Sequence, residues 1–198
     1  FSLKGIDSSH SYLTSRGLSK DTAELFGVGF FPGKGSMTGR VAIVTGAARG
    51  LGRAYAEAMA REGAAIVAGD VRDCADTVSA IRGASGRALG VALDVASFAS
   101  CQALAEAAVR EFGRVDALIN NAALYANLKG GRFEQLDEAQ WDRVMQVNVK
   151  GVWNCCRAIV PLMRAQKSGS VINISSLAPI YGMPYALDYS VSKVAVIA

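Results

Sequence analysis

From residue 40 onward, short apolar runs alternate with longer stretches in which apolar residues recur at helical spacing. The runs have the length of strands, and the stretches between them are amphipathic. We therefore predict strands at 40–45, 64–69, 88–93, 115–120 and 170–175. The predicted helices are 51–62, 72–82, 97–112, a long helix from Asp137 past Val152, and a last helix that begins near Asp188.

Capping residues support two of these helices. Ser97 and Asp137 stand where a helix begins, and Gly113 stands just past a predicted end. Strands that are apolar throughout, separated by amphipathic helices, predict a parallel sheet that is covered on both faces. Right-handed crossovers then favour an α/β fold with a doubly wound, Rossmann-type parallel sheet.

The first 36 residues have a different pattern. They are rich in glycine and contain one short helix candidate, from Ser19 to Phe26, before a linker-like tract at 31–36. We predict an N-terminal extension of unknown role at 1–36 and one α/β domain at 37–198, for which Met37 is a plausible start.

Composition removes several classes of protein. Of 198 residues, 51% are hydrophobic and 19% charged, which excludes disorder along the whole chain. No apolar run approaches the ~20 residues that span a bilayer, and the opening segment lacks the apolar core of a secretory signal. The four cysteines form no CxxC pair, which favours reduced thiols in a cytoplasmic protein without a membrane segment.

Charge and histidine content narrow the chemistry further. The chain has one histidine, His10, so a multi-histidine metal site is impossible and a Ser-His triad is not expected. The net charge of +4 is modest, and no long basic run is present, so we expect no nucleic-acid partner.

The segment Thr45–Gly52, TGAARGLG, lies between a predicted strand and a predicted helix. Gly46 allows a tight turn, Gly50 lets a pyrophosphate approach the backbone, and Gly52 lets the helix pack closely on the strand. The helix N-terminus offers free N–H groups to phosphates. The pattern predicts a dinucleotide site, although a purely structural turn remains the alternative.

Two acidic residues lie at neighbouring strand ends. Asp70 ends the second predicted strand, 18 residues after Gly52, and Asp94 ends the third. A carboxylate at Asp70 can accept both ribose hydroxyls and repels a 2′-phosphate, which favours NAD over NADP. Arg49 favours the opposite choice, because a guanidinium can pair with that phosphate.

A second constellation stands near the C-terminal end. Tyr189 and Lys193 are four residues apart and share a face if the segment is helical. An ammonium beside a phenol stabilises the phenolate, which suits acid/base work. Ser176 precedes Tyr189 by 13 residues and could bond a substrate oxygen, while an exposed helix pair and ordinary turn chemistry are the alternatives.

These motifs, with LDV at 93–95, NNAA at 120–123 and VNVKG at 147–151, resemble the short-chain dehydrogenase/reductase family over 37–198. The resemblance implies that Tyr189 is the general acid/base, that Lys193 assists it and holds the nicotinamide ribose, and that Ser176 orients the substrate. It implies a water-placing role for Asn148. The remaining cofactor-binding residues that it implies are Gly46, Arg49, Gly50, Leu51, Gly52, Asp70, Asp94, Val95, Asn121, Ala122 and Ala123.

Three departures from that pattern stand out. Ala123 replaces a glycine, which we expect the loop to tolerate. Family members continue beyond the position of Ala198 and are homo-oligomers, so we expect a truncated domain with one open sheet edge and weak or no activity. Residues 10–36 weakly resemble a segment of bacterial DNA primases.

The sequence thus favours an oxidoreductase that transfers a hydride between NAD and an alcohol or ketone. Four alternatives stay open: NADP as cofactor, a dinucleotide-binding module without catalysis, an NADPH-dependent 3-oxoacyl-type ketoreductase, and a primase-related protein that rests on residues 12–30 alone. Apolar residues around 177–185 favour a hydrophobic small-molecule substrate.

Overall fold

The computed structural model describes residues 9, 14–15, 19–21, 37–183 and 185–197 of the chain. The chain divides into two units, Phe1–Ser36 and Met37–Ala198, which are described separately. In the first unit, Thr14, Ser15, Lys20 and Asp21 are helical. The rest of the helix predicted from Ser19 to Phe26, and most of the primase-like segment, lie outside the described residues.

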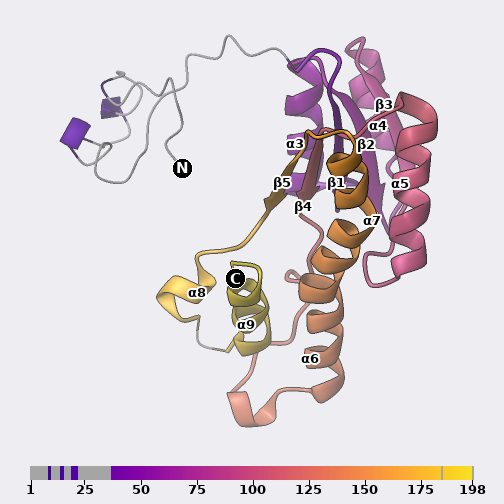
Figure 1. Cartoon of the computed structure of the whole chain (residues 1–198). Helices are drawn as coiled ribbons and strands as arrows, with labels where there is room; N and C mark the ends of the chain where they lie inside the picture. Colours follow the sequence, from indigo (N-terminus) through magenta and orange to yellow (C-terminus); the bar gives the residue numbers. More distant parts are fainter. Residues whose placement is uncertain (1–8, 10–13, 16–18, 22–36, 184, 198) are drawn as a thin grey trace. The chain divides into compact units, whose positions relative to one another are not determined.

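The second unit is built on a parallel sheet of five strands (Figure 1). The strand order β3-β2-β1-β4-β5 reverses between β1 and β4, which confirms the doubly wound topology. Ligands of such sheets bind beyond the carboxyl ends of the strands at this reversal. The strands are β1 (Val41–Thr45), β2 (Ala65–Asp70), β3 (Arg87–Ala92), β4 (Ala117–Asn120) and β5 (Ser170–Asn173).

The predicted helices are confirmed, each beginning within three residues of its expected position. They are α3 (Gly50–Arg61), α4 (Ala75–Gly83), α5 (Phe98–Phe112), α6 (Glu138–Met145), α7 (Gly151–Ala165) and α9 (Leu187–Ala195). A π-helical segment, η2 (Gln146–Lys150), joins α6 to α7, so the predicted long helix is one continuous element with a local widening. The sequence did not predict the short helices η1 (Phe133–Gln135) and α8 (Ala178–Tyr181).

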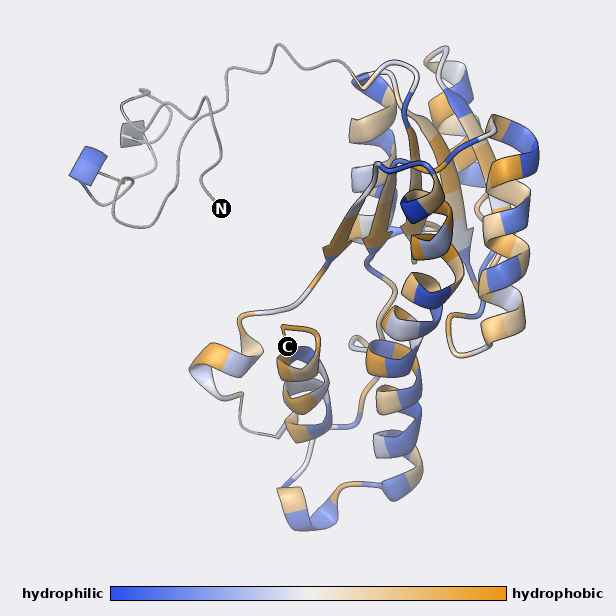
Figure 2. Cartoon of the chain, in the orientation of Figure 1, coloured by the Kyte–Doolittle hydropathy of each residue, from blue (hydrophilic) through white to orange (hydrophobic). Residues whose placement is uncertain are grey.

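Alternate residues of β1 belong to two separate hydrophobic cores. Val41 and Ile43 pack with apolar residues of α5 and α7, whereas Ala42 and Val44 pack with residues of α3 and α4. Figure 2 shows the hydrophobic residues gathered in the strands and on the helix faces that meet them. Both faces of the central strands are therefore covered, as the run of apolar residues predicts.

The expected caps are present. The Ser97 side chain accepts a hydrogen bond from the Ser100 amide, and Asp137 accepts one from the Ala139 amide. Gly113 ends α5 with a left-handed backbone, φ 78°. These short-range contacts explain why the helix ends could be predicted from the sequence.

The prediction for the fifth strand was wrong in two respects. All four residues of β5 are exposed, including Val171 and Ile172, so this edge strand is not covered on both faces. The strand also ends at Asn173 and not at 175. The Ile174 amide still donates to the Asn120 carbonyl of β4 at 3.0 Å, whereas the Ile174 carbonyl accepts a hydrogen bond from the Lys193 ammonium.

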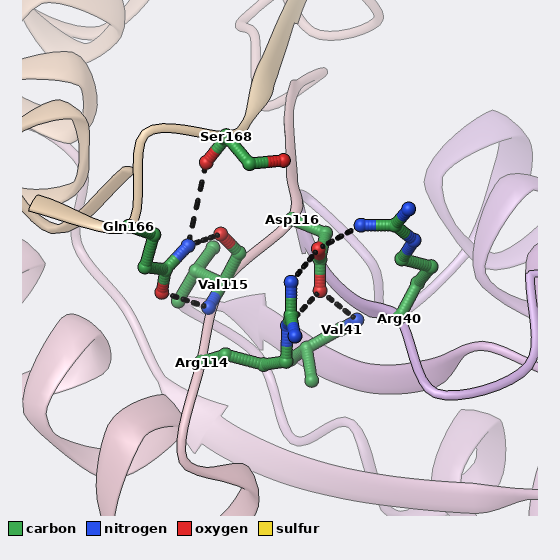
Figure 3. A network of polar contacts seen from close by, with 7 residues as sticks. All are labelled: Arg40, Val41, Arg114, Val115, Asp116, Gln166 and Ser168. Carbon is green, nitrogen blue, oxygen red and sulfur yellow. Dashed lines mark hydrogen bonds and ion pairs between the residues drawn. The ribbon is translucent and has the colours of Figure 1, made fainter. Parts of the chain in front are cut away.

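Charged side chains fasten the opposite, amino-terminal ends of β1 and β4 (Figure 3). The Asp116 carboxylate accepts hydrogen bonds from Arg40, from Arg114 and from the Val41 amide, at 2.7–2.9 Å. Burial by itself raises the pKa of Asp116, but these hydrogen bonds outweigh it and hold the pKa below its usual value. The network fixes the sheet away from the ligand-binding edge.

Candidate functional site

Two glycines of the predicted turn are required by close packing. A Cβ on Gly46, where φ is +68°, would lie 2.9 Å from the Ala122 Cα atom. A Cβ on Gly52 would lie 2.1 Å from the Gly46 carbonyl oxygen. The start of α3 therefore rests directly on the turn, which is the role that the sequence assigned to Gly52.

The third glycine faces open space. A Cβ on Gly50 would meet nothing within 4 Å, and φ is +58°. The neighbouring Arg49 and Leu51 are exposed, and the first turn of α3 has neither a side-chain cap nor an acidic residue. Free N–H groups beside an open glycine can donate hydrogen bonds to an anion, so the turn fits the pyrophosphate of a dinucleotide.

Asp70 lies against this turn. One oxygen of its carboxylate accepts a hydrogen bond from the Ala48 amide at 3.0 Å, and the other accepts one from the Arg72 amide at 3.0 Å. The glycine turn has a second contact with Thr77 of α4, whose hydroxyl donates to the Ala47 carbonyl at 2.8 Å. Each oxygen of an ionised carboxylate can accept more than one bond, so Asp70 can still receive a hydroxyl.

Asp94 and Val95 follow β3 at the same edge of the sheet. The exposed Asp94 carboxylate accepts a hydrogen bond from the Ala96 amide at 2.9 Å. The Val95 side chain is buried, and its carbonyl accepts a bond from Asn154 at 2.9 Å. A ligand at this strand end would therefore meet the Asp94 carboxylate and the backbone of Val95, not its side chain.

The end of β4 is joined to the end of β1 at the strand-order reversal. The Thr45 hydroxyl oxygen accepts hydrogen bonds from the amides of Asn121 and Ala122, both at 3.0 Å. The Asn121 side chain donates in turn to the Thr45 carbonyl at 2.9 Å. Ala123 is exposed and has a negative φ, so its methyl group causes no backbone strain there.

Asn148 lies fully buried in the π-helical segment η2 and joins two distant parts of the chain. Its side chain accepts a hydrogen bond from the Leu124 amide at 2.8 Å and donates to the Leu124 carbonyl at 3.2 Å. It also donates to the Ser192 hydroxyl of α9 at 3.0 Å. The loop that follows β4 and the helix that carries Tyr189 are thereby held together.

Tyr189 and Lys193 share the buried side of α9, as their spacing predicts. They are 9% and 4% exposed, and the Lys193 Nζ atom lies 5.9 Å from the centroid of the Tyr189 ring. The ammonium donates to the Ile174 carbonyl at 2.7 Å, and burial lowers its pKa. Figure 1 shows α9 beyond the carboxyl end of β5 and beside α6.

Ser176 behaves as a turn residue in this structure. Its hydroxyl oxygen accepts a hydrogen bond from the Ala178 amide at 3.1 Å, at the start of α8. The neighbouring Ser175 hydroxyl donates to the Lys193 carbonyl at 2.8 Å. Within the described part of the chain, Ser176 forms no hydrogen bond with Tyr189 or Lys193.

Sequence reasoning gave no role to the side chains that connect these parts. Thr77, Gln140 and Ser192 lie inside helices and carry no local signal. Gln140 donates to the Asp188 carboxylate at 2.8 Å and also bonds the backbone of Lys129. Among the side chains that connect these parts, only Thr45 could have been recognised from the sequence, because it begins the glycine motif.

A metal site and a membrane-spanning helix were also sought among the described residues. No set of three or more His, Cys, Asp or Glu side chains among the described residues could hold a metal ion. No helix in the same residues combines the length and the apolar content that are needed to cross a bilayer.

Comparison with known proteins agrees with this geometry. The family model described as short chain dehydrogenase matches residues 40–198. The chain is 36% identical over 163 residues to 3-oxoacyl-(acyl-carrier-protein) reductase FabG of Thermotoga maritima, covering 81% of this chain and 65% of the relative. It is 42% identical over 158 residues to cis-4-hydroxycyclohexanecarboxylate dehydrogenase of Sinomonas cyclohexanicum, covering 79% and 63%.

A solved structure extends the comparison. The chain matches a short-chain dehydrogenase/reductase of Burkholderia phymatum in complex with NAD, with a TM-score of 0.78 and 37% identity, over 82% of this chain and 58% of that one. The chain thus spans less than two thirds of the length of each of these three relatives. On the family match, the strand order and the glycine turn, the chain belongs to the short-chain dehydrogenase family.

Proposed function

We propose that the protein is an NAD-dependent oxidoreductase that interconverts a secondary alcohol and a ketone, with Tyr189 as the general acid/base. The observation that carries the proposal is a path from the start of the glycine motif to α9, made of hydrogen bonds and the short backbone segment from Ala122 to Leu124. Thr45 holds Ala122, and Asn148 holds both Leu124 and Ser192. These contacts tie the candidate nucleotide site and the candidate catalytic helix to one rigid frame.

Each side chain has a distinct task in this proposal. A bound nicotinamide cofactor would supply the hydride chemistry. Tyr189 gives a proton to the ketone oxygen, or takes one from the alcohol, at its phenolic oxygen. Lys193 places a positive charge beside that ring and stabilises the phenolate. Ser176 orients the substrate oxygen, because its hydroxyl oxygen accepts from the Ala178 amide and its O–H can still donate.

Asn148 is proposed as a positioning residue. Both N–H donors of its amide are used by Leu124 and Ser192, and its oxygen accepts from the Leu124 amide, so its first effect is to hold the loop after β4 against α9. A water molecule beside it, which the resemblance implies, would lead protons from Lys193 toward solvent. Asn148 would therefore both hold the loop after β4 against α9 and place the water that conducts protons.

NAD is favoured over NADP by the position of Asp70. The carboxylate lies beside the glycine turn through its bond to Ala48, so a phosphate on the ribose would meet a negative charge. Arg49 is exposed and free to pair with such a phosphate. We give Asp70 the greater weight, because a guanidinium at the surface contributes little binding free energy.

The substrate is proposed to be a small, hydrophobic alcohol or carbonyl compound. Large apolar side chains are exposed after β5, namely Leu177, Ile180, Tyr181, Met183 and Tyr185. The relatives named for a cyclohexane alcohol and for a 3-oxoacyl thioester share the alcohol–ketone chemistry. We also propose a cytoplasmic protein that forms homo-oligomers and has no nucleic-acid or membrane partner.

An NADPH-dependent 3-oxoacyl-type reductase and a dinucleotide-binding protein without catalysis are the competing functions. Tyr189→Phe, compared with Tyr55→Phe on α3, separates catalysis from binding. We expect Tyr189→Phe to lower turnover of secondary alcohols by about 100-fold or more while NAD affinity stays within about twofold. Tyr55→Phe should change neither quantity.

Cofactor fluorescence and initial rates measure the two effects. Unchanged turnover in Tyr189→Phe would contradict the assigned role of the phenol. Absence of turnover in every variant, with NAD still bound, would favour the non-catalytic alternative. A clear preference for NADPH with 3-oxoacyl substrates would favour the reductase.

A further inference from the structure

Tyr125 lies directly on the candidate acid/base residue. The centroids of the Tyr125 and Tyr189 rings are 4.6 Å apart, and the ring planes are tilted by 43°. The two rings differ sharply in exposure, because Tyr189 is 9% exposed and Tyr125 is 54% exposed. One side of Tyr125 therefore contacts the buried phenol, while much of the ring remains open to a ligand.

The backbone around Tyr125 is held at several points. Leu124, immediately before it, is bonded through both its amide and its carbonyl to Asn148. The Tyr125 carbonyl accepts a hydrogen bond from the Leu128 amide at 3.1 Å. The Gln140 side chain accepts a hydrogen bond from the Lys129 amide at 2.9 Å and donates one to the Lys129 carbonyl at 3.1 Å. These contacts fix the backbone on either side of Tyr125, and the contact with Tyr189 positions its ring.

A second loop meets the first near the same place. The Gly131 amide donates to the Tyr185 carbonyl at 3.1 Å, and a Cβ on Gly130 would lie 3.6 Å from the Tyr185 Cβ atom. Tyr185 is exposed and has a φ of 67°, which a tyrosine rarely adopts. Two loops that carry exposed aromatic rings are thus joined beside α9.

These observations concern the substrate side of the proposed reaction, and the inference rests on that proposed function. We infer that Tyr125 is a specificity-determining residue whose exposed ring forms one wall of the substrate site. The favoured substrate class is a ring-shaped secondary alcohol or cyclic ketone.

The preference for rings follows from shape and entropy. A saturated six-membered ring can place several C–H groups on an aromatic face at once, next to the phenol that handles its oxygen. A flexible chain of equal carbon number must lose rotational freedom to make the same contact. The two classes should therefore differ most when the aromatic wall is present and least when it is removed.

Cyclohexanol and 2-hexanol form a matched pair of probes with equal carbon number. We expect the unmodified chain to oxidise cyclohexanol with a kcat/KM about tenfold above that of 2-hexanol. Tyr125→Ala should lower kcat/KM for cyclohexanol by about tenfold and for 2-hexanol by less than about threefold. Tyr125→Phe keeps the aromatic face and should stay within about twofold of the unmodified chain for both alcohols.

Phe133→Ala is the control, since this exposed aromatic residue lies in η1 and has no role in the proposed site, and NAD affinity should be equal in all variants. An unchanged preference for the ring in Tyr125→Ala, or an equal preference for both alcohols in the unmodified chain, would overturn the inference. So would a loss in Tyr125→Phe as large as in Tyr125→Ala, because the hydroxyl would then be the recognising group.

A binding measurement separates failure of this inference from failure of the proposed function. Absence of turnover with both alcohols, while NAD binds, overturns the proposed function. Saturation-transfer NMR with cyclohexanone and 2-hexanone on the NADH-loaded chain then decides the inference alone. The inference is supported if the signal of cyclohexanone exceeds that of 2-hexanone and Tyr125→Ala removes this excess. Equal signals for the two ketones, or an excess that Tyr125→Ala leaves unchanged, overturn it.

Discussion

The ammonium of Lys193 donates a hydrogen bond to the backbone carbonyl of Ile174, 2.7 Å away, at the residue that directly follows β5. This contact ties the last turn of α9 to the carboxyl end of the sheet. It also keeps a buried positive charge within 5.9 Å of the Tyr189 ring centroid.

Replacement of Lys193 by methionine keeps an apolar stem and removes the charge. We expect turnover to fall by about 100-fold or more, because the phenolate loses its stabilising ammonium. Lys150→Met, at an exposed position, serves as the control and should leave turnover unchanged. Steady-state rates of folded, NAD-saturated protein provide the measurement, and equal rates in the two variants would refute this role of Lys193.

The same substitution should alter the alkaline stability profile. Burial lowers the pKa of Lys193 in the folded state, so the unfolded chain binds more protons as the pH approaches about 10. The free energy of unfolding of the unmodified chain therefore gains a contribution as the pH rises through that range. Urea titrations should show this gain in the unmodified chain and its loss in Lys193→Met.

Asn148 and Asn154 offer a comparison between two buried asparagines of one continuous helical element. Each makes hydrogen bonds that its alanine variant would lose, so we expect both variants to be destabilised by about 2–3 kcal/mol. Asn148 joins Leu124 to Ser192, whereas Asn154 bonds the carbonyls of Val95 and Ala96. Turnover per folded molecule should therefore fall in Asn148→Ala and stay nearly normal in Asn154→Ala. Equal effects on turnover would contradict a positioning role for Asn148.

Asp70→Asn tests the choice of cofactor. The amide oxygen of asparagine can still accept the Ala48 hydrogen bond, while the Arg72 amide loses its acceptor and the negative charge is removed. We expect the ratio of NADP to NAD affinity to rise by about tenfold, because a close like charge costs on the order of 1 kcal/mol or more. Asp73→Asn, an exposed neighbour whose bond to Ala75 is preserved in the same way, should leave the ratio unchanged. Binding titrations with both dinucleotides would show an unaltered ratio if Asp70 lies away from the ribose.

Asp116 should control part of the acid stability. Its pKa is lower in the folded chain than in the unfolded chain, so the stabilisation is complete above about pH 4 and is lost as the pH falls through the folded value. Asp116→Asn should be less stable than the unmodified chain at pH 7, and the difference should shrink below about pH 4. Urea midpoints across this range provide the measurement, with Glu57→Gln in the surface pair with Arg53 as the control. A difference that does not depend on pH would exclude an ionic role for Asp116.

The sequence predicted those parts of the fold that depend on local signals. The strands, the helix starts at Ser97 and Asp137, and the left-handed Gly113 all arise from short-range periodicity or capping. The glycine turn follows from its motif between a strand and a helix, and the neighbouring position of Asp70 from its place at the end of the next strand.

Other features arise from contacts between distant residues, which periodicity does not reveal. The Asn148–Ser192 bond joins residues 44 positions apart, and the Tyr125 ring meets that of Tyr189 across a loop of no regular pattern. Ser176 had the expected spacing from Tyr189, yet its hydroxyl accepts a bond from a helix start that the sequence did not predict. The exposure of β5 likewise depends on which elements lie beside it, not on its own apolar residues.

The central claim is that the glycine turn and the Tyr189–Lys193 pair serve one hydride transfer. It is tested most directly by incubating the chain with NAD and cyclohexanol that carries deuterium on the carbinol carbon, and then measuring the mass of the dinucleotide. We predict that the deuterium appears in NADH and that Tyr189→Phe lowers the rate of its transfer by about 100-fold or more. A chain that binds neither dinucleotide, or NADH that forms without the deuterium, would contradict the account.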